Sequence, residues 1–136
     1  MAARMTNGRF EGTAGPIDGT YLTMYTINSA PTDNQWTEIT ALQNGDRGFT
    51  AVRFYSPDRF GNVSEVEFYS DDLKLTGTPY GTAGTWGGSN ADFSKVFDGD
   101  ITTYFDCAQA EAYAGLILQD GATTPPMISL RRQKSK

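Results

Sequence analysis

The chain has 136 residues, of which 38% are hydrophobic and 20% charged, a length suited to one globular domain with one core. Its formal net charge of −5 argues against a nucleic-acid partner, because phosphate binding needs a positive surface. The chain contains no histidine, which excludes Ser-His-Asp and Cys-His catalysis and histidine metal sites. The composition does not exclude hydrolysis by a pair of carboxylates or a cation site with oxygen ligands.

Short runs of alternating apolar residues, separated by turn residues, predict an all-β protein. The strands are expected, in chain order, at 9–12, 20–27, 36–42, 49–56, 64–69, 74–78, 113–118 and 127–131. In the fifth strand, side chains should alternate between the two faces. Val66 and Phe68 are therefore expected to point inward, and Glu65 and Glu67 outward.

Turn residues separate these strands. Turns are expected at 44–46, 56–58 and 120–121, where Asn, Asp, Pro and Gly gather. One short helix is expected at 91–96, and Trp36, inside a strand pattern, is expected in the core. About eight short strands without long helices favour a sandwich or a jelly roll.

The ends of the chain and its cysteine suggest little specific chemistry. No apolar run approaches the ~18 residues of a membrane span, and no apolar signal core stands at the N-terminus. The single cysteine, Cys107, has no partner for an internal disulfide and is expected to be a buried thiol. The basic residues at 131–136 indicate a solvated end or the start of a linker.

Two stretches carry a more specific pattern. Residues 95–106 read KVFDGDITTYFD and are followed by an apolar strand at 113–118; residues 52–69 read VRFYSPDRFGNVSEVEFY. Together they resemble the early Asp-Gly-Asp loop and the closing strands of discoidin-like domains. This family, also called coagulation-factor C-type, includes many bacterial carbohydrate-binding modules. The resemblance implies a galactose-binding-like jelly-roll sandwich, located outside the cell or on its surface and forming part of a larger multidomain protein.

The two motifs stand in the reverse of the family's order. Joining the last residue to the first would restore that order, so that 1–70 matches the family's second half and 71–136 its first half. Residues 70–75 would then bridge termini that lie side by side in the family, at a small entropic cost. We therefore expect a single circularly permuted domain. The alternative is a strand-swapped assembly in which each half completes a neighbour's half.

A group of oxygen-bearing side chains predicts a cation site. Two carboxylates and a hydroxyl come from Asp98, Asp100 and Thr103, on a turn that Gly99 is expected to make. Ca²⁺ prefers such hard oxygen ligands, although Asp-Gly-Asp is also common turn chemistry. The resemblance adds the carbonyl of Lys95 and a carbonyl–carboxylate pair that matches Ser64 and Glu65. It implies a structural Ca²⁺, or Na⁺ in some members, without a catalytic role.

The resemblance also indicates a sugar-binding surface. Its expected residues are Phe60, Asn7, Arg131, Arg132, Asp106 and Trp86. Aromatic rings stack on the C–H faces of sugars, and Arg, Asn and carboxylate groups bind the hydroxyls. Phe60 is the best aromatic candidate because it stands in a predicted loop at 58–62. Trp86 could instead pack under the edge of the sandwich, together with Tyr80.

Four functions are weighed against these features. The leading hypothesis is a non-catalytic module, not an enzyme, that binds a poly- or oligosaccharide. The alternative is a structural or adhesion domain of the same fold without a sugar site; it is favoured because Asp106 and Gln109 replace the His and stacking Trp of many sugar binders. Phospholipid binding suits an acidic chain poorly. A glycosidase that uses Asp98 and Asp100 is disfavoured, because both are expected in a turn or a cation site.

Overall fold

The computed structural model describes residues 7–28, 36–39, 42–43, 49–63, 65–70, 73–82, 93–99, 105–118 and 127–131. The elements, in chain order, are β1 (Arg9–Thr13), β2 (Leu22–Thr26), β3 (Trp36–Ile39), β4 (Ala51–Val63), β5 (Glu65–Ser70), β6 (Leu73–Lys74), β7 (Gly77–Gly81), the 3₁₀ helix η3 (Phe93–Phe97), β8 (Phe105–Leu118) and β9 (Met127–Arg131). The protein is all-β, as the sequence predicted. No helix in these ranges is long and apolar enough to cross a membrane.

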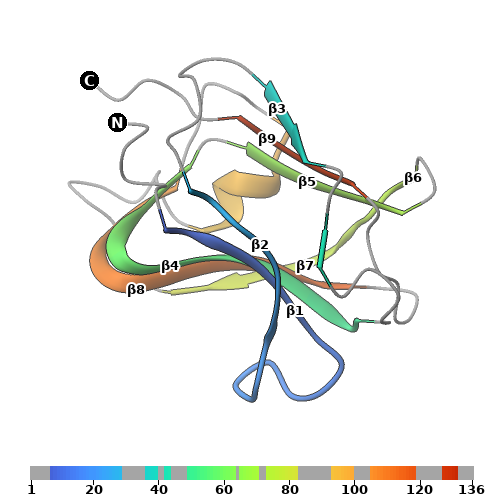
Figure 1. Ribbon diagram of the computed structural model, residues 1–136, viewed down its shortest axis with the longest axis horizontal. Helices are drawn as coiled ribbons and strands as arrows, with labels where there is room; N and C mark the ends of the chain where they lie inside the picture. Colours follow the sequence, from blue (N-terminus) through green and yellow to red (C-terminus); the bar gives the residue numbers. More distant parts are fainter. Residues whose placement is uncertain are drawn as a thin grey trace.

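The strands form two antiparallel sheets (Figure 1). One sheet has the order β2-β1-β4-β8-β7 and the other the order β3-β9-β5-β6. The short helix η3 lies between the two layers. The arrangement is sandwich-like, and the two sheets share one core.

Phenylalanine rings join the two layers. Phe10 on β1 packs against Phe54 on β4, with ring centroids 5.6 Å apart. Phe10 also meets Phe68 on β5 of the opposite sheet, at 6.2 Å and nearly edge-on. All three side chains are fully buried, and each contributes roughly 1.5–3 kcal/mol through removal of its apolar surface from water. The inward orientation predicted for Val66 and Phe68 is confirmed, because both are buried in this core.

The turn predicted at 56–58 is wrong. β4 continues through it and pairs with β8 as far as Val63, and the two strands curve together at the left of Figure 1. The ladder is irregular between Ser56 and Phe60, where Pro57 has no N–H to donate. On the facing part of β8, Glu111 has a positive φ of 60°. The turn residues therefore bend a continuous strand instead of reversing the chain.

This also corrects the loop predicted at 58–62. The backbone of Phe60 lies in β4 opposite Ala110, so Phe60 stands in a paired strand. The placement of Trp36 in the core is wrong as well: its side chain is 43% exposed at the start of the edge strand β3. The helix expected at 91–96 is a 3₁₀ helix over Phe93–Phe97. The turns predicted at 44–46 and 120–121 lie outside the described residues.

Candidate cation site and ligand surfaces

Glu65, the first residue of β5, is buried, with only 1% of its surface exposed. The outward orientation predicted for it is therefore wrong. The physical reason is tertiary: η3 and the turn after it pack against β5 and bring Asp98 to the Glu65 side chain. The backbone of Glu65 pairs with that of Arg131 at the end of β9.

The turn after η3 depends on glycine. Gly99 has a φ of 76°, in the left-handed region that glycine enters without a steric penalty. A Cβ built on Gly99 would meet no atom within 4 Å, so the constraint is conformational and not one of space. As predicted, a glycine shapes the turn here, and the turn holds Asp98 beside Glu65.

The buried carboxyl of Glu65 thus meets the carboxyl of Asp98, a residue that is exposed to solvent. Burial, and after it the neighbouring Asp98 carboxyl group, raises the pKa of Glu65 to about 9. The Gly99 N–H and the Lys74 ammonium oppose this shift only in part. Both carboxylate oxygens of Glu65 are buried, and neither has a hydrogen-bond partner of standard geometry among the described residues. A buried carboxylate without a donor or a counter-charge is strongly destabilising, so the site suits a proton or a cation.

The chemistry of these groups fits a hard cation. Ca²⁺ takes six to eight oxygen ligands, and carboxylates supply the charge. The described residues provide the Glu65 and Asp98 carboxylates and, in η3 just before Asp98, the backbone of Lys95. Within the described ranges, no group of three or more His, Cys, Asp or Glu side chains could hold a metal. The other expected ligands, Ser64, Asp100 and Thr103, lie outside these ranges.

Several residues expected at the sugar site lie at the same end of the sandwich. Asp106 pairs with Asn62 near the end of the β4–β8 ladder. Asn62 precedes Glu65 closely in the chain, so this end of the ladder leads into β5. Arg131 lies at the end of β9, opposite Glu65. The backbones of Asp106 and Arg131 are therefore near the two carboxylates. Only the backbone course is described for Phe60, Asp106 and Arg131.

The remaining sugar-site candidates are less well connected. Asn7 is exposed, precedes β1 and has a φ of 70°; its N–H donates to the carbonyl of Ile27. Arg132 and Trp86 lie outside the described residues. Tyr80, grouped with Trp86 in the sequence, is buried in β7.

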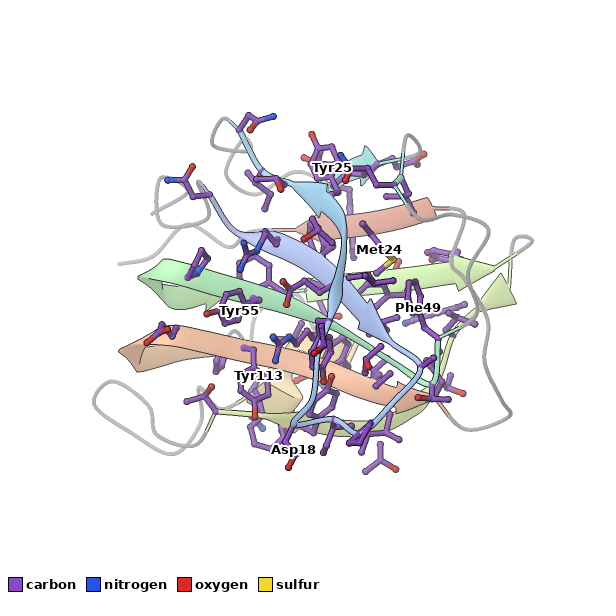
Figure 2. The ribbon with its side chains drawn as sticks, turned by 60° about the horizontal axis from the view of Figure 1, so that its bottom comes forward. Asp18, Met24, Tyr25, Phe49, Tyr55 and Tyr113 are labelled. Atoms are coloured by element: carbon purple, nitrogen blue, oxygen red, sulfur yellow. The ribbon has the colours of Figure 1, made fainter. Side chains whose placement is uncertain are left out.

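The structure adds a cluster that the sequence did not single out, on the outer face of the five-stranded sheet. Arg9, Tyr55 and Tyr113 form one row across β1, β4 and β8, because Arg9 pairs with Tyr55 and Tyr55 with Tyr113. Figure 2 shows Tyr55 and Tyr113 side by side on this face. In the next row, Glu11 pairs with Arg53. We call this surface the tyrosine–arginine face; its members are Arg9, Glu11, Arg53, Tyr55, Tyr113, Tyr21 and Tyr80.

Arg53 is the centre of this face. Its Nε and Nη2 each lie 2.9 Å from Oε1 of the buried Glu11. Its guanidinium carbon lies 3.6 Å from the ring centroid of Tyr21 and 4.8 Å from those of Tyr55 and Tyr113. Such contacts combine an ion pair with cation–π attraction.

Tyr21 closes over Arg53 from the β1–β2 loop. The hydroxyls of Tyr21 and Tyr80 are 2.7 Å apart, and the Tyr21 hydroxyl also donates to the carbonyl of Ile17. Burial raises the pKa of both tyrosines, so both are neutral at physiological pH. The period-two pattern could have shown that Arg9 and Glu11 share one face, as do Arg53 and Tyr55. It could not show that β1, β4 and β8 are neighbours.

A further hollow lies beneath the β1–β2 loop. This open pocket has a volume of about 710 Å³. Its lining residues are Thr13, Ala14, Gly15, Pro16, Gly19, Thr20, Leu22 and Phe49. Among the described residues, its lining has no charged side chain and two hydroxyls, so these residues offer few groups with which to select a polar ligand.

Comparison with known proteins gives no relative: no family model, curated protein or solved structure matches the chain.

Proposed function

We propose that the protein is a non-catalytic carbohydrate-binding domain with a circularly permuted, galactose-binding-like jelly-roll sandwich that a bound Ca²⁺ stabilises. The observation that carries the proposal is the meeting of Glu65 and Asp98. The resemblance assigns these two distant positions to one cation, and they lie together, with no hydrogen bond of standard geometry to the Glu65 oxygens from the part of the chain that the structure describes. A discoidin-like fold would account for this geometry, in which the buried Glu65 carboxyl lies beside the exposed Asp98 carboxyl.

The course of the chain at β5 and β6 supports the permutation. The proposed bridge between the family's termini falls here, where Tyr69 pairs with Lys74 and Ser70 with Leu73. Only residues 71 and 72 separate the two strands. Closing so short a connection between adjacent strands costs little entropy.

A cation at this place would tie the two permuted halves together. Glu65 belongs to the half that matches the family's second part, and Lys95 and Asp98 to the other half. The carboxylates would supply the negative charge, and Na⁺ is the weaker alternative because it carries half the charge of Ca²⁺. The location outside the cell and the larger parent protein belong to the same proposal.

We place the glycan at the end of the sandwich that carries Asp106, Arg131 and Phe60, beside the cation. One observation favours the second candidate function, a structural or adhesion domain without a sugar site. Phe60 stands in a paired strand and not in the loop that made it the best stacking residue.

Two measurements on the whole chain test the proposal. The first is a glycan-array screen of the wild type and Phe60→Ala in Ca²⁺-containing buffer, with thermal unfolding of both. The second is calorimetric Ca²⁺ titration of the wild type and Asp98→Asn, with Asp18→Asn as control because Asp18 is an exposed loop carboxylate. We expect Phe60→Ala to abolish glycan binding without unfolding the protein, and Asp98→Asn to weaken Ca²⁺ binding at least about tenfold.

Each measurement tests a different part of the proposal. Ca²⁺ binding without recognition of any glycan would select the structural domain. Absence of Ca²⁺ binding, or equal affinity in both aspartate variants, would refute the cation site.

A further inference from the structure

The tyrosine–arginine face has the form of a binding platform. Arg9, Tyr55 and Tyr113 stand in register on three adjacent strands, which lie about 4.8 Å apart in a sheet. Both tyrosines are half-buried, so part of each ring is open to solvent. A row of partly exposed rings on a rigid sheet can meet a flat, extended molecule.

The platform is organised before any ligand arrives. Arg53 is held by Glu11 and by three tyrosine rings, and Tyr21 is tied to Tyr80 through their hydroxyls. Fixing side chains in advance removes an entropic cost of binding. The face therefore requires little rearrangement to accept a ligand.

Its charge is opposite to that of the whole molecule. Two guanidinium groups, of Arg9 and Arg53, face one carboxylate, that of Glu11, in a chain with a net charge of −5. Nε of Arg9 lies 3.2 Å from Oε2 of Glu11, an ion pair without a hydrogen bond of standard geometry, and the Arg9 guanidinium lies 5.1 Å from the Tyr55 ring centroid. The Arg9 side chain is 37% exposed, and the ion pair found among the described residues uses its Nε and not its two terminal nitrogens. These nitrogens form a fork suited to a carboxylate.

The combination selects a class of ligand. Tyrosine rings stack on the C–H faces of sugars, and a guanidinium fork beside them binds an acidic group in a bidentate manner. The single partly exposed guanidinium of Arg9 offers too little positive charge for the many phosphates of a nucleic acid. We propose that the outer face of the five-stranded sheet is a second binding site, specific for an acidic oligosaccharide whose sugar rings carry carboxylates. This site is separate from the end of the sandwich and does not depend on the cation or on Phe60.

The test uses the whole chain and a defined probe, a tetragalacturonate, with its fully methyl-esterified form as the uncharged match. Affinities are measured by calorimetry for the wild type, Arg9→Gln and Lys74→Gln. Lys74 is the matched control: it is a partly exposed cation, 45% exposed and paired with Glu67 at 3.1 Å, but it lies on the other sheet. Thermal unfolding shows whether each variant is folded, and NMR titration of the wild type maps the contacts without any substitution.

We expect Arg9→Gln to weaken tetragalacturonate binding at least about tenfold, because a charge-assisted bidentate contact is lost. Lys74→Gln should change it less than about twofold, and the ester should bind less tightly than the acid. The largest shifts should fall on the amides of Tyr55 and Tyr113. The proposal is overturned by absence of binding, by equal affinity of Arg9→Gln and wild type, by equal affinity for acid and ester, or by shifts confined to the end that carries Phe60. Loss of array binding in Phe60→Ala bears only on the site at the end of the sandwich.

Discussion

Replacing Glu65 by glutamine is expected to stabilise the protein when no Ca²⁺ is present. The pKa of this carboxyl is about 9 in the folded protein, against 4.5 for an ordinary glutamate, because of burial and then of Asp98. At pH 7 the unfolded chain ionises Glu65, whereas the folded protein keeps it protonated. This difference lowers the free energy of unfolding by roughly 3 kcal/mol.

The sign of the pH dependence follows from the direction of the shift. Because the folded pKa lies above the unfolded one, the metal-free wild type binds more protons when folded, and it loses stability as the pH rises from about 4.5 to about 9. Glutamine does not titrate, and, like a protonated glutamate, it can donate a hydrogen bond to the Asp98 carboxylate. The free energy of unfolding of Glu65→Gln should therefore not fall over this pH range.

The assay is thermal unfolding in a chelator and in excess Ca²⁺. At about 3 °C per kcal/mol for a domain of this size, Glu65→Gln should melt roughly 10 °C above the wild type at pH 7 without metal. The gap should close toward pH 4.5. Excess Ca²⁺ at about 100 times its Kd should stabilise the wild type by about 2.7 kcal/mol and the variant far less. Glu67→Gln, on the same strand but paired with Lys74 and Tyr69, is the matched control and should shift by about 1 kcal/mol or less.

Two results would refute this reasoning. One is a metal-free Glu65→Gln protein that melts below the wild type at pH 7, which would mean that Glu65 is ionised and favourably placed without a cation. The other is equal stabilisation of both proteins by Ca²⁺, which would place the cation elsewhere.

Three further predictions rest on other contacts. Ca²⁺ binding at pH 7 should displace close to one proton from Glu65, seen as binding heats that depend on the ionisation enthalpy of the buffer; equal heats would contradict the raised pKa. Glu11→Gln should destabilise by about 3 kcal/mol in urea unfolding, because it leaves two guanidinium groups without their carboxylate. Gly12→Ala should destabilise by about 1–3 kcal/mol, because its Cβ would lie 2.6 Å from the Phe49 ring. Gly15→Ala, whose Cβ would meet Oγ1 of Thr13 at an ordinary contact distance of 3.8 Å, is its control, and equal loss in both would contradict the clash.

Local patterns predicted most of the strands and the inward-facing residues of β5. Alternation along β5 identified Val66 and Phe68 as core residues, because an apolar side chain in every second position can be buried only on one face. Asp98 was expected beside a turn made by Gly99, and the φ of 76° at Gly99 confirms the turn. These features depend on neighbours in the chain, so the residues themselves carry the information.

The errors arose where non-local pairing overrode a local preference. The residues Ser56, Pro57 and Asp58 have turn chemistry, yet the long ladder with β8 keeps them extended, and Pro57 is accommodated at an irregularity. Trp36 lies in a strand pattern, but the edge position of β3 exposes it. The alternation of apolar and polar residues along a strand does not show which strand it pairs with or where it lies in a sheet.

The sequence by itself determined the all-β class, the inward-facing residues Val66 and Phe68 of β5 and the position of the Gly99 turn, because each follows from residue types and spacing within one segment. Only the tertiary structure decided that Glu65 is buried against Asp98 and that Arg9, Tyr55 and Tyr113 form one row. Both groupings bring together side chains from elements far apart in the chain. Their burial, charge and pKa depend on which strands pair, and that is settled by closure of the whole core.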